Sequence, residues 1–446
     1  MRKAFSATTR FGAKVSWVLQ SILEGSMYFL ETKSEGKCGL NKSAVGPKFV
    51  SPQLVSAKPP GVRLALALLF ALLLATAAPA HGQTETVRYS FANSPDGANP
   101  RYVTPVLDTT GNLYGTTNYG GAYGLGAVFE LTPSGTETVL HSFDVNGMDG
   151  AYPEAGPVLY RGNLYGTTVE GGTYNIDGTV FELKHTTKGW EEKILHSFGA
   201  AGDGSQPYCV LTVDTATGNL YGTTNAGGTY SYGTVFKLTP SGTETVLWSF
   251  GNGTDGANPV AGVVRDTAGN LYGTTEYGGD YGYGTVFELT PSGTERVLWS
   301  FGNGTDGAHP LARLVIYKGN LYGTTVDGGI YGDGTVFEVT LSGTEKIRHA
   351  FDNNDIDGFH PHAGLTIYQG NFYGTTASGG GIASAAGTVF EMTPSGTTYS
   401  ILHTFGGDPD GAFPYGGVAF DKSGNLYGTT SSGGTNGFGT VYKMTP

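Results

Sequence analysis

Residues 111–117 read GNLYGTT, and the same seven letters return at Gly162, Gly218, Gly269, Gly319 and Gly424. A seventh copy, GNFYGTT, begins at Gly370. The copies follow one another at about fifty residues, so the 446-residue chain is first of all a repeat array. Glycine accounts for 74 residues, but 27 Tyr and 23 Phe accompany it. Disordered chains are poor in aromatic residues, so the glycines indicate tight turns in an all-β protein.

Each copy contains four short runs rich in β-branched and aromatic residues. In the copy that begins at Glu244 they are ETVLWSF, AGVVRD, NLYGTT and GTVFELT. Gly, Pro, Asp or Asn bounds each run, and none has the 3.6-residue apolar period of a helix. Four strands in about 40–50 residues is the spacing of a β-propeller blade.

The two ends of the repeat region complement each other. The region opens with ETVRYSF at residues 85–91 and stops with GTVYKMTP at residues 439–446. In the other copies a run like ETVLWSF follows GTVFELTP, and the last copy lacks this run. We expect residues 85–91 to pair with residues 439–445, which removes the open edges of a linear array. This pairing predicts a closed seven-bladed β-propeller, with a parallel β-solenoid as the alternative. The phenylalanine that ends the first run occurs seven times, as Phe91, Phe143, Phe198, Phe250, Phe301, Phe351 and Phe405.

The N-terminal part has a different composition. Residues 64–78 form an uncharged apolar run that follows Lys58 and Arg63 and leads to an Ala-Pro-Ala cleavage pattern. The run is shorter than the ~20 residues of a membrane span. We expect a start-site extension or disordered segment at 1–60, a signal peptide at 61–80 and the propeller at 84–446. An uncleaved signal anchor is the alternative; cleavage predicts a secreted protein, extracellular or periplasmic, without membrane insertion.

Removal of residues 1–80 makes the chain strongly acidic. These residues hold 10 of the 25 basic and 3 of the 37 acidic side chains, which leaves 15 basic and 34 acidic ones, a net charge of −19. Such a chain is a poor partner for nucleic acids or anionic lipids, and we expect neither. Cys38 precedes the signal and only Cys209 remains, so an internal disulfide is excluded. We expect a monomer.

The succession G-N-L-Y-G-T-T, G-G and G-T-V-F-E-L-T-P-S-G-T resembles the GloVer-type tandem repeat of bacterial choice-of-anchor proteins, over residues 85–446. It is similar, more loosely, to kelch repeats, with an aromatic such as Trp248 or Trp299 in the first run. The kelch alignment makes AGVVRD the inner strand and ETVLWSF the outer one. The resemblance implies an exported propeller without a defined activity. Family members often end in an anchoring tail, whereas this sequence stops after a strand at Pro446.

An Asp-Gly-x-x-Pro motif recurs in every copy. Because all copies share it, we interpret it as part of the blade, with Asp accepting backbone N–H groups in a turn. One copy favours calcium as the alternative, because Asn353, Asp355 and Asp357 match the opening of a calcium loop, N-x-D-x-D-G. Gly364 stands where an EF-hand needs Glu. No other cofactor is indicated. The seven aspartates are Asp96, Asp149, Asp203, Asp255, Asp306, Asp357 and Asp410.

Positions that differ between copies are better candidates for a ligand site, because a ligand site on a ring is asymmetric. The residue after the repeated Pro precedes the inner strand and should face the channel. The two residues before Gly-Gly vary as well. Tyr, Glu and Asp in such positions suit a sugar, through ring stacking and hydrogen bonds. The candidate ligand-binding residues are Glu154, Glu170, Tyr208, Glu276, Tyr277, Asp327, His362 and Tyr415.

Two further sets have a structural interpretation beside the functional one. Tyrosines after Gly-Gly either extend the sugar-binding face or cover the rim of a blade; they are Tyr123, Tyr174, Tyr230, Tyr281 and Tyr331. Histidines in the slot of Tyr89, Trp248 and Trp299 indicate aromatic packing rather than metal ligation; they are His141, His196, His349 and His403.

Catalytic sequence motifs are missing. The chain has no G-x-S-x-G, no H-E-x-x-H and no Walker A motif. We interpret the protein as a non-catalytic binding or scaffold module for a carbohydrate or a surface protein. The alternatives are a polysaccharide-active hydrolase or lyase that uses carboxylates such as Glu154 and Glu170, and a purely structural envelope protein.

Overall fold

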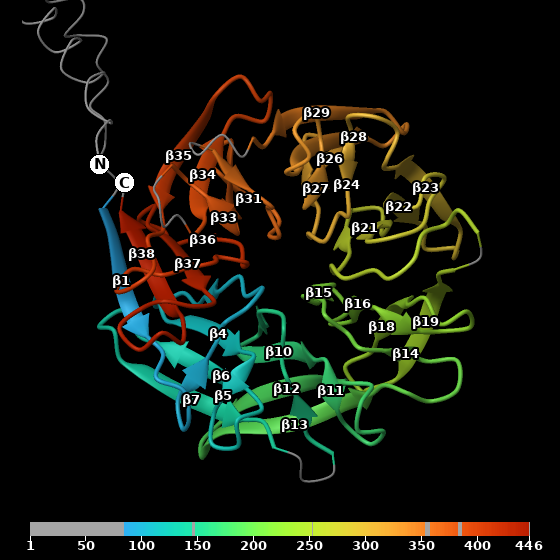
Figure 1. The fold of residues 1–446 in the computed structure, drawn as a ribbon. Coiled ribbons are helices and arrows are strands. Elements are labelled where there is room, and N and C mark those ends of the chain that lie inside the picture. The colour runs from blue at the N-terminus through green and yellow to red at the C-terminus, as the bar shows by residue number, and fades with distance from the viewer. Residues whose placement is uncertain (1–83, 145–147, 252, 353–356, 382–385, 446) are drawn as a thin grey trace, which may run out of the picture. The chain divides into compact units, whose positions relative to one another are not determined.

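The computed structural model describes residues 84–144, 148–251, 253–352, 357–381 and 386–445. These residues form a closed ring of seven β-sheets (Figure 1), so the predicted seven-bladed propeller is confirmed and the β-solenoid alternative is wrong. The described residues contain strands and turns only, and none of their elements is a helix long and apolar enough to cross a membrane. The predicted extension and signal peptide lie outside the described residues.

Each blade is an antiparallel sheet of four strands. We number the blades 1–7 in chain order and list the strands of each blade from the inner one, called the first, to the outer one, called the fourth. Blades 1–3 are β3 (Val106–Leu107), β4 (Leu113–Thr117), β6 (Ala127–Leu131), β7 (Glu137–Ser142); β9 (Val158–Tyr160), β10 (Asn163–Thr168), β12 (Thr179–Thr186), β13 (Gly189–Ser197); and β15 (Thr212–Val213), β16 (Leu220–Thr224), β18 (Thr234–Leu238), β19 (Glu244–Ser249). Blades 4–6 are β20 (Val264–Arg265), β21 (Leu271–Thr275), β22 (Thr285–Leu289), β23 (Glu295–Ser300); β25 (Val315–Tyr317), β26 (Asn320–Thr325), β28 (Thr335–Thr340), β29 (Glu345–Ala350); and β31 (Thr366–Tyr368), β32 (Asn371–Thr376), β34 (Thr388–Met392), β35 (Tyr399–Thr404). The AGVVRD run is thus the inner strand and the ETVLWSF run the outer one.

Blade 7 combines the two ends of the propeller. It consists of β36 (Ala419–Phe420), β37 (Leu426–Thr430), β38 (Thr440–Thr445) and, outermost, β1 (Thr84–Ser90). Strands β1 and β38 pair antiparallel from Thr84 opposite Thr445 to Ser90 opposite Thr440. The predicted closure of the ring by the first strand is therefore confirmed.

The glycine of GTT leaves room for an aromatic ring on the neighbouring strand. In six blades a Cβ atom added at this glycine would lie 2.5–2.7 Å from the Cζ atom of the phenylalanine at the third position of the third strand, too close for any side chain. In blade 7 Tyr442 takes the place of this phenylalanine over Gly428. The glycines are Gly115, Gly166, Gly222, Gly273, Gly323, Gly374 and Gly428.

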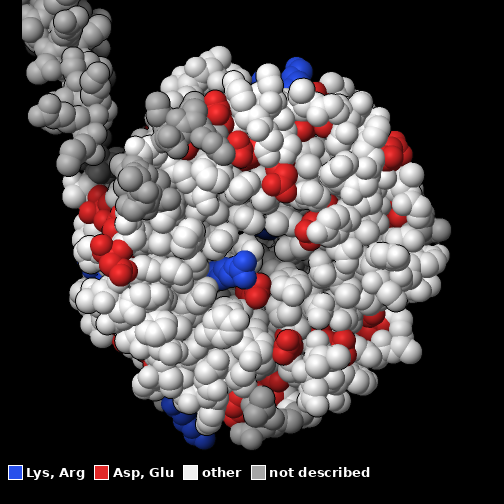
Figure 2. Space-filling model, in the orientation of Figure 1, with Lys and Arg blue, Asp and Glu red and all other residues white. Residues whose placement is uncertain are grey.

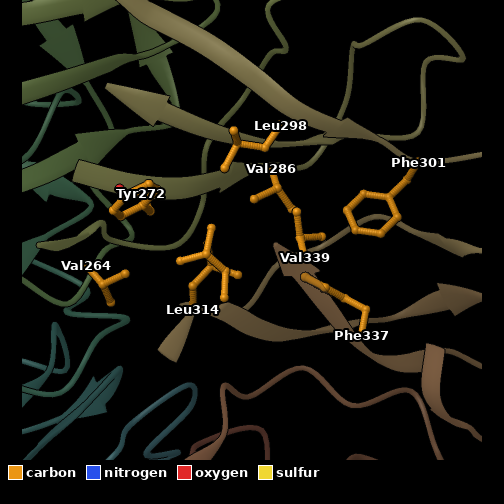
Figure 3. Close-up of a cluster of buried hydrophobic side chains, with 9 residues drawn as sticks. Val264, Tyr272, Val286, Leu298, Phe301, Leu314, Phe337 and Val339 are labelled. Atoms are coloured by element: carbon orange, nitrogen blue, oxygen red, sulfur yellow. The ribbon is translucent and has the colours of Figure 1, made fainter. Parts of the chain in front are cut away.

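The same rings join each blade to the one before it. The phenylalanine that follows the outer strand of one blade meets the third-strand ring of the next blade edge-to-face, with centroids 5.0–5.5 Å apart. Figure 3 shows such a core between blades 4 and 5, where Phe301 and Phe337 lie beside Leu298, Leu314 and Val339. The hydrophobic core therefore lies between the blades. The pairs are Phe91–Phe129, Phe143–Phe181, Phe198–Phe236, Phe250–Phe287, Phe301–Phe337, Phe351–Phe390 and Phe405–Tyr442.

The first threonine of GTT makes a hydrogen bond to the next blade. Thr223 Oγ1, for example, donates to the carbonyl oxygen of Ala261 at 2.9 Å, and Thr429 of blade 7 donates to Val103 of blade 1 at 3.0 Å. All seven threonines are buried and all seven make the equivalent bond, at 2.8–3.4 Å. A buried carbonyl without this donor would be costly, so the threonine holds the start of each inner strand.

The repeated aspartate acts as a turn residue, as expected. Asp149 Oδ1 accepts the N–H of Gly150 at 2.6 Å, and its Oδ2 lies 3.1 Å from Nε2 of His141. A backbone N–H donates to the aspartate in six of the seven copies; both oxygens of Asp255 have no partner among the described residues. The histidines also pack edge-on against the following phenylalanine, for example His196 on Phe198 at 4.7 Å. The aromatic packing of this slot is therefore confirmed, and it includes a hydrogen bond to the aspartate.

We predict that Gly273→Ala destabilises the propeller by about 1–3 kcal/mol, the usual cost of overpacking a filled core. The added methyl group would lie 2.6 Å from Cζ of Phe287 and 3.2 Å from Cγ1 of Val263. Denaturant midpoints of the wild type, Gly273→Ala, Phe287→Leu and the double variant measure the effect. The glycine substitution should cost clearly less in the Phe287→Leu background, and equal costs in both backgrounds would contradict the proposed clash.

We predict a pH dependence of stability at the interface between blades 4 and 5. Burial, followed by the charge of Asp306, raises the pKa of the Glu345 carboxyl from 4.5 to about 7. The neutral form is thus favoured in the folded protein, so its stability contribution is complete below pH 4.5 and is lost as the pH rises through 7. Glu345→Gln should therefore raise the melting temperature relative to wild type more at pH 8 than at pH 5. The exposed Glu191→Gln is the control, and an equal shift at both pH values would contradict the assignment.

Candidate functional site

A cavity of about 330 Å³ lies on the axis of the propeller, and residues of all seven blades or their entering loops line it. Figure 2 shows the central hollow with basic and acidic atoms side by side at its mouth. The entering loops bring the residue after each repeated proline to the wall. Six of the seven such residues line the cavity: Glu154, Tyr208, Val260, Leu311, His362 and Tyr415.

Aromatic side chains form one side of the cavity. The Tyr415 ring lies 5.4 Å from the Tyr102 ring and 5.0 Å from the imidazole of His362. The guanidinium of Arg101 lies over both tyrosines, 4.8 Å from the centroid of Tyr102 and 5.1 Å from that of Tyr415. Burial lowers the pKa of His362 to about 4, so its ring is neutral at pH 7. This side offers flat apolar surface together with a cation.

Two carboxylates, Glu154 and Glu276, and the amide of Asn225 line the cavity together with Tyr208. Glu154 Oε1 accepts a hydrogen bond from Nδ2 of Asn118 at 3.2 Å. Burial raises the pKa of the Glu154 carboxyl, while Arg101 acts in the opposite direction. Glu276 and Asn225 come from the ends of the second strands of blades 4 and 3. Burial and then the charge of Glu154 raise the pKa of the Tyr208 hydroxyl, which is therefore a donor at neutral pH.

Arg313 is a wall residue that the sequence analysis missed. Its Nη2 donates to Thr212 Oγ1 at 2.7 Å, and the guanidinium also faces the carbonyl oxygen of Val263 at 3.4 Å. Burial lowers the pKa of its guanidinium, and none of the described carboxylates makes an ion pair with it. Comparison of the copies would have revealed it, because glycine occupies this place in four of them. These glycines are Gly156, Gly262, Gly364 and Gly417.

Two of the other three candidates belong to two-stranded ribbons, and the third, Tyr277, forms an isolated antiparallel bridge with Ala257. Glu170 lies in β11 (Glu170–Gly171), which pairs with β8 (Gly150–Ala151), and Asp327 lies in β27 (Asp327–Gly328), which pairs with β24 (Gly307–Ala308). Asp327 Oδ2 is 2.9 Å from Nδ1 of His309, and its Oδ1 is 3.7 Å from Nε2 of His360. Tyr277 is 45% exposed. None of the three lines the cavity. The remaining ribbons are β2 (Gly97–Ala98) with β5 (Tyr119–Gly120), β14 (Gly204–Ser205) with β17 (Ala226–Gly227), and β30 (Gly358–Phe359) with β33 (Ser378–Gly379).

Exposed tyrosines follow these ribbons. The five tyrosines after Gly-Gly are 45–60% exposed, so each presents part of its side chain to solvent. They lie in the same hairpins as Asn118, Asn225 and Glu276, which reach Glu154 or the cavity wall. The hairpins therefore carry aromatic rings outward from the mouth of the cavity.

The predicted calcium loop is only partly described. Asn353 and Asp355 lie outside the described residues. Asp357 has the role of the other repeated aspartates, because its Oδ2 is 2.9 Å from Nε2 of His349 and its Oδ1 accepts the N–H of Gly358 at 2.9 Å.

Solved structures similar to this chain are distant in sequence. The extracellular domain of the provisionally assigned one-component system BT4673 from B. thetaiotaomicron matches at 11% identity with a TM-score of 0.51; the match covers 81% of this chain and 40% of that one. A provisionally assigned 6-phosphogluconolactonase from Bacteroides uniformis matches at 16% identity with a TM-score of 0.45, over 71% of this chain and 88% of that one. The first of these likenesses shows the fold alone.

Sequence comparison gives the family. No curated protein matches the chain. The profile of the Gloeobacter/Verrucomicrobia repeat matches residues 74–215, 162–385 and 317–446, which together include the whole propeller. The chain therefore belongs to the Gloeobacter/Verrucomicrobia repeat family.

Proposed function

We propose that the protein is a non-catalytic binding module and that its ligand is a carbohydrate held at the central cavity. The observation that carries this proposal is the combination of tyrosine rings with carboxylate and amide groups around one cavity: Tyr102, Tyr208 and Tyr415 with Glu154, Glu276 and Asn225. Sugar rings present C–H faces that stack on aromatic rings and hydroxyl groups that pair with carboxylates and amides.

The exposed tyrosines suggest how a longer chain would bind. A cavity of about 330 Å³ suits a terminal unit of one or two sugars. Further units of a polysaccharide would then lie over rings such as Tyr230 and Tyr281, which are 45% and 47% exposed. The proposal includes export, supported by the apolar run at residues 64–78. A surface protein is the alternative partner.

A second candidate function is glycoside hydrolysis. It is favoured by the pKa of Glu154, which burial raises as a general acid requires, and by the presence of Glu276 in the same cavity. The pair differs from the carboxylates expected from the sequence, since Glu170 does not line the cavity. Reducing ends released from a polysaccharide, and lost in Glu154→Gln, would support this function over binding alone.

We predict saturable binding of one glycan class on a broad glycan array, followed by calorimetry with the best ligand. Tyr208→Ala should weaken binding on the order of tenfold, the effect of a lost stacking ring with its hydrogen bond. Glu154→Gln should weaken it about ten- to a hundredfold, because a hydrogen bond to a charged group is worth ~1.5–3 kcal/mol.

The control is Glu191→Gln, an exposed carboxylate on the outer strand β13, which should leave the affinity unchanged. An array without any bound glycan would contradict the proposal, and binding that survives both cavity substitutions would place the ligand elsewhere.

A further inference from the structure

Within the described part of the chain, three of the seven interfaces between blades bring a histidine and two carboxylates together. The histidine ends the outer strand of one blade, the aspartate is that of the repeated motif, and the glutamate lies in the outer strand of the next blade. In each set, one donor atom of each residue lies within 4.8 Å of the other two. The sets are His141, Asp149, Glu192; His196, Asp203, Glu244; and His403, Asp410, Glu85.

The distances agree with ligands of one metal ion. Nε2 of His141 lies 3.1 Å from Oδ2 of Asp149 and 4.0 Å from Oε1 of Glu192. In the other two sets the histidine and aspartate atoms are 2.9 and 3.1 Å apart. Two donors at about 2.0–2.1 Å from a tetrahedral zinc ion lie roughly 3.3 Å apart. Since the donor atoms of each set lie within 4.8 Å of one another, a shortening of their separations by at most about 1.5 Å would complete each set.

One oxygen of each glutamate is buried without a hydrogen bond from the described part of the chain. Oε1 of Glu85, Glu192 and Glu244 is buried and has no hydrogen-bond partner among the described residues, and the same holds for Oδ1 of Asp410. The equivalent glutamates Glu137, Glu295 and Glu345 share this feature, so the histidine distinguishes the three sets from those interfaces. Each glutamate oxygen also faces the carboxylate of the aspartate. Adjacent buried carboxylates require a positive charge between them, either a proton or a metal ion. The side chains of His141 and His196 are 21% and 18% exposed, so an ion from solvent can reach the sets.

We propose that these three interfaces bind a divalent transition metal ion of the zinc class, each through one imidazole nitrogen and two carboxylates, with one position open to water. Such ligands are those that zinc takes in proteins. Binding requires a free lone pair on Nε2 and an ionised glutamate, so it releases protons to solvent. Because the ligands come from consecutive blades, the ion would link the two blades.

The remaining interfaces provide natural controls. Trp248, Trp299 and Tyr89 replace the histidine in three of them, and an indole N–H offers no lone pair to a metal. The last has His349 and Asp357, but Tyr399 replaces the glutamate and stacks on His349 with the ring centroids 4.0 Å apart. These four interfaces should not bind the ion.

The experiment measures bound zinc per chain. The purified protein is treated with chelator, dialysed, titrated with zinc chloride by calorimetry and analysed for metal by mass spectrometry. The wild type should bind three ions, with a rise in melting temperature. His141→Ala, His196→Ala and His403→Ala should each bind two. His349→Ala should still bind three, and Tyr399→Glu should bind a fourth.

His309→Ala tests whether other histidines bind zinc, because His309 and His360 flank Asp327 near the cavity. That variant should also keep three ions. The proposal is overturned if the wild type binds no zinc, or if a variant with all three substitutions at His141, His196 and His403 binds as much as the wild type. Circular dichroism confirms that each variant is folded, and Glu192→Gln offers a milder substitution of the same site.

Discussion

The closed propeller depends on one aromatic contact. The phenylalanine that follows the outer strand of each blade packs against the aromatic side chain in the third strand of the next blade. A single four-stranded sheet has two faces to cover, and here its neighbours cover both. The Phe250–Phe287 pair shows the requirement, because the ring of Phe287 also lies over the backbone of Gly273. A side chain at that glycine would lift the ring away from its partner. The glycine, the two aromatic rings and the interblade threonine therefore form one unit, and the whole structure repeats it seven times.

Much of this could be predicted because the chain contains seven versions of one blade. Residues shared by all copies, such as Gly222 and Thr223, contact the neighbouring strand or the next blade. The site was predictable only in part. Five of the eight candidates line the cavity: four of them follow the repeated proline and precede the inner strand, and the fifth, Glu276, follows the second strand of blade 4. Glu170 and Asp327, which lie in two-stranded ribbons, and Tyr277, which lies in an isolated bridge, do not line it.

Residues that the sequence did not reveal meet through folding alone. His141 and Glu192 are about fifty residues apart and come from different blades, so no local spacing connects them. Arg313 occupies a position where most copies have a small residue, two residues after Leu311, which follows the repeated proline. The residues at the blade interface and in the cavity wall thus differ between copies. The residues shared by all copies form the blades and determine only where the differing residues are placed.

The closure of the ring has a consequence for biosynthesis. Six blades consist of contiguous sequence, and their hairpins can form while the chain is being made. Blade 7 joins β1 to β38, the first and last strands of the propeller, so it cannot be completed before β38 has been synthesised. Contacts between such distant segments are slow to form. Until then β1 is an unpaired strand whose sequence closely matches six others in the same chain. A molecule whose ring is still open can thus exchange this strand with a neighbouring copy, as in domain swapping.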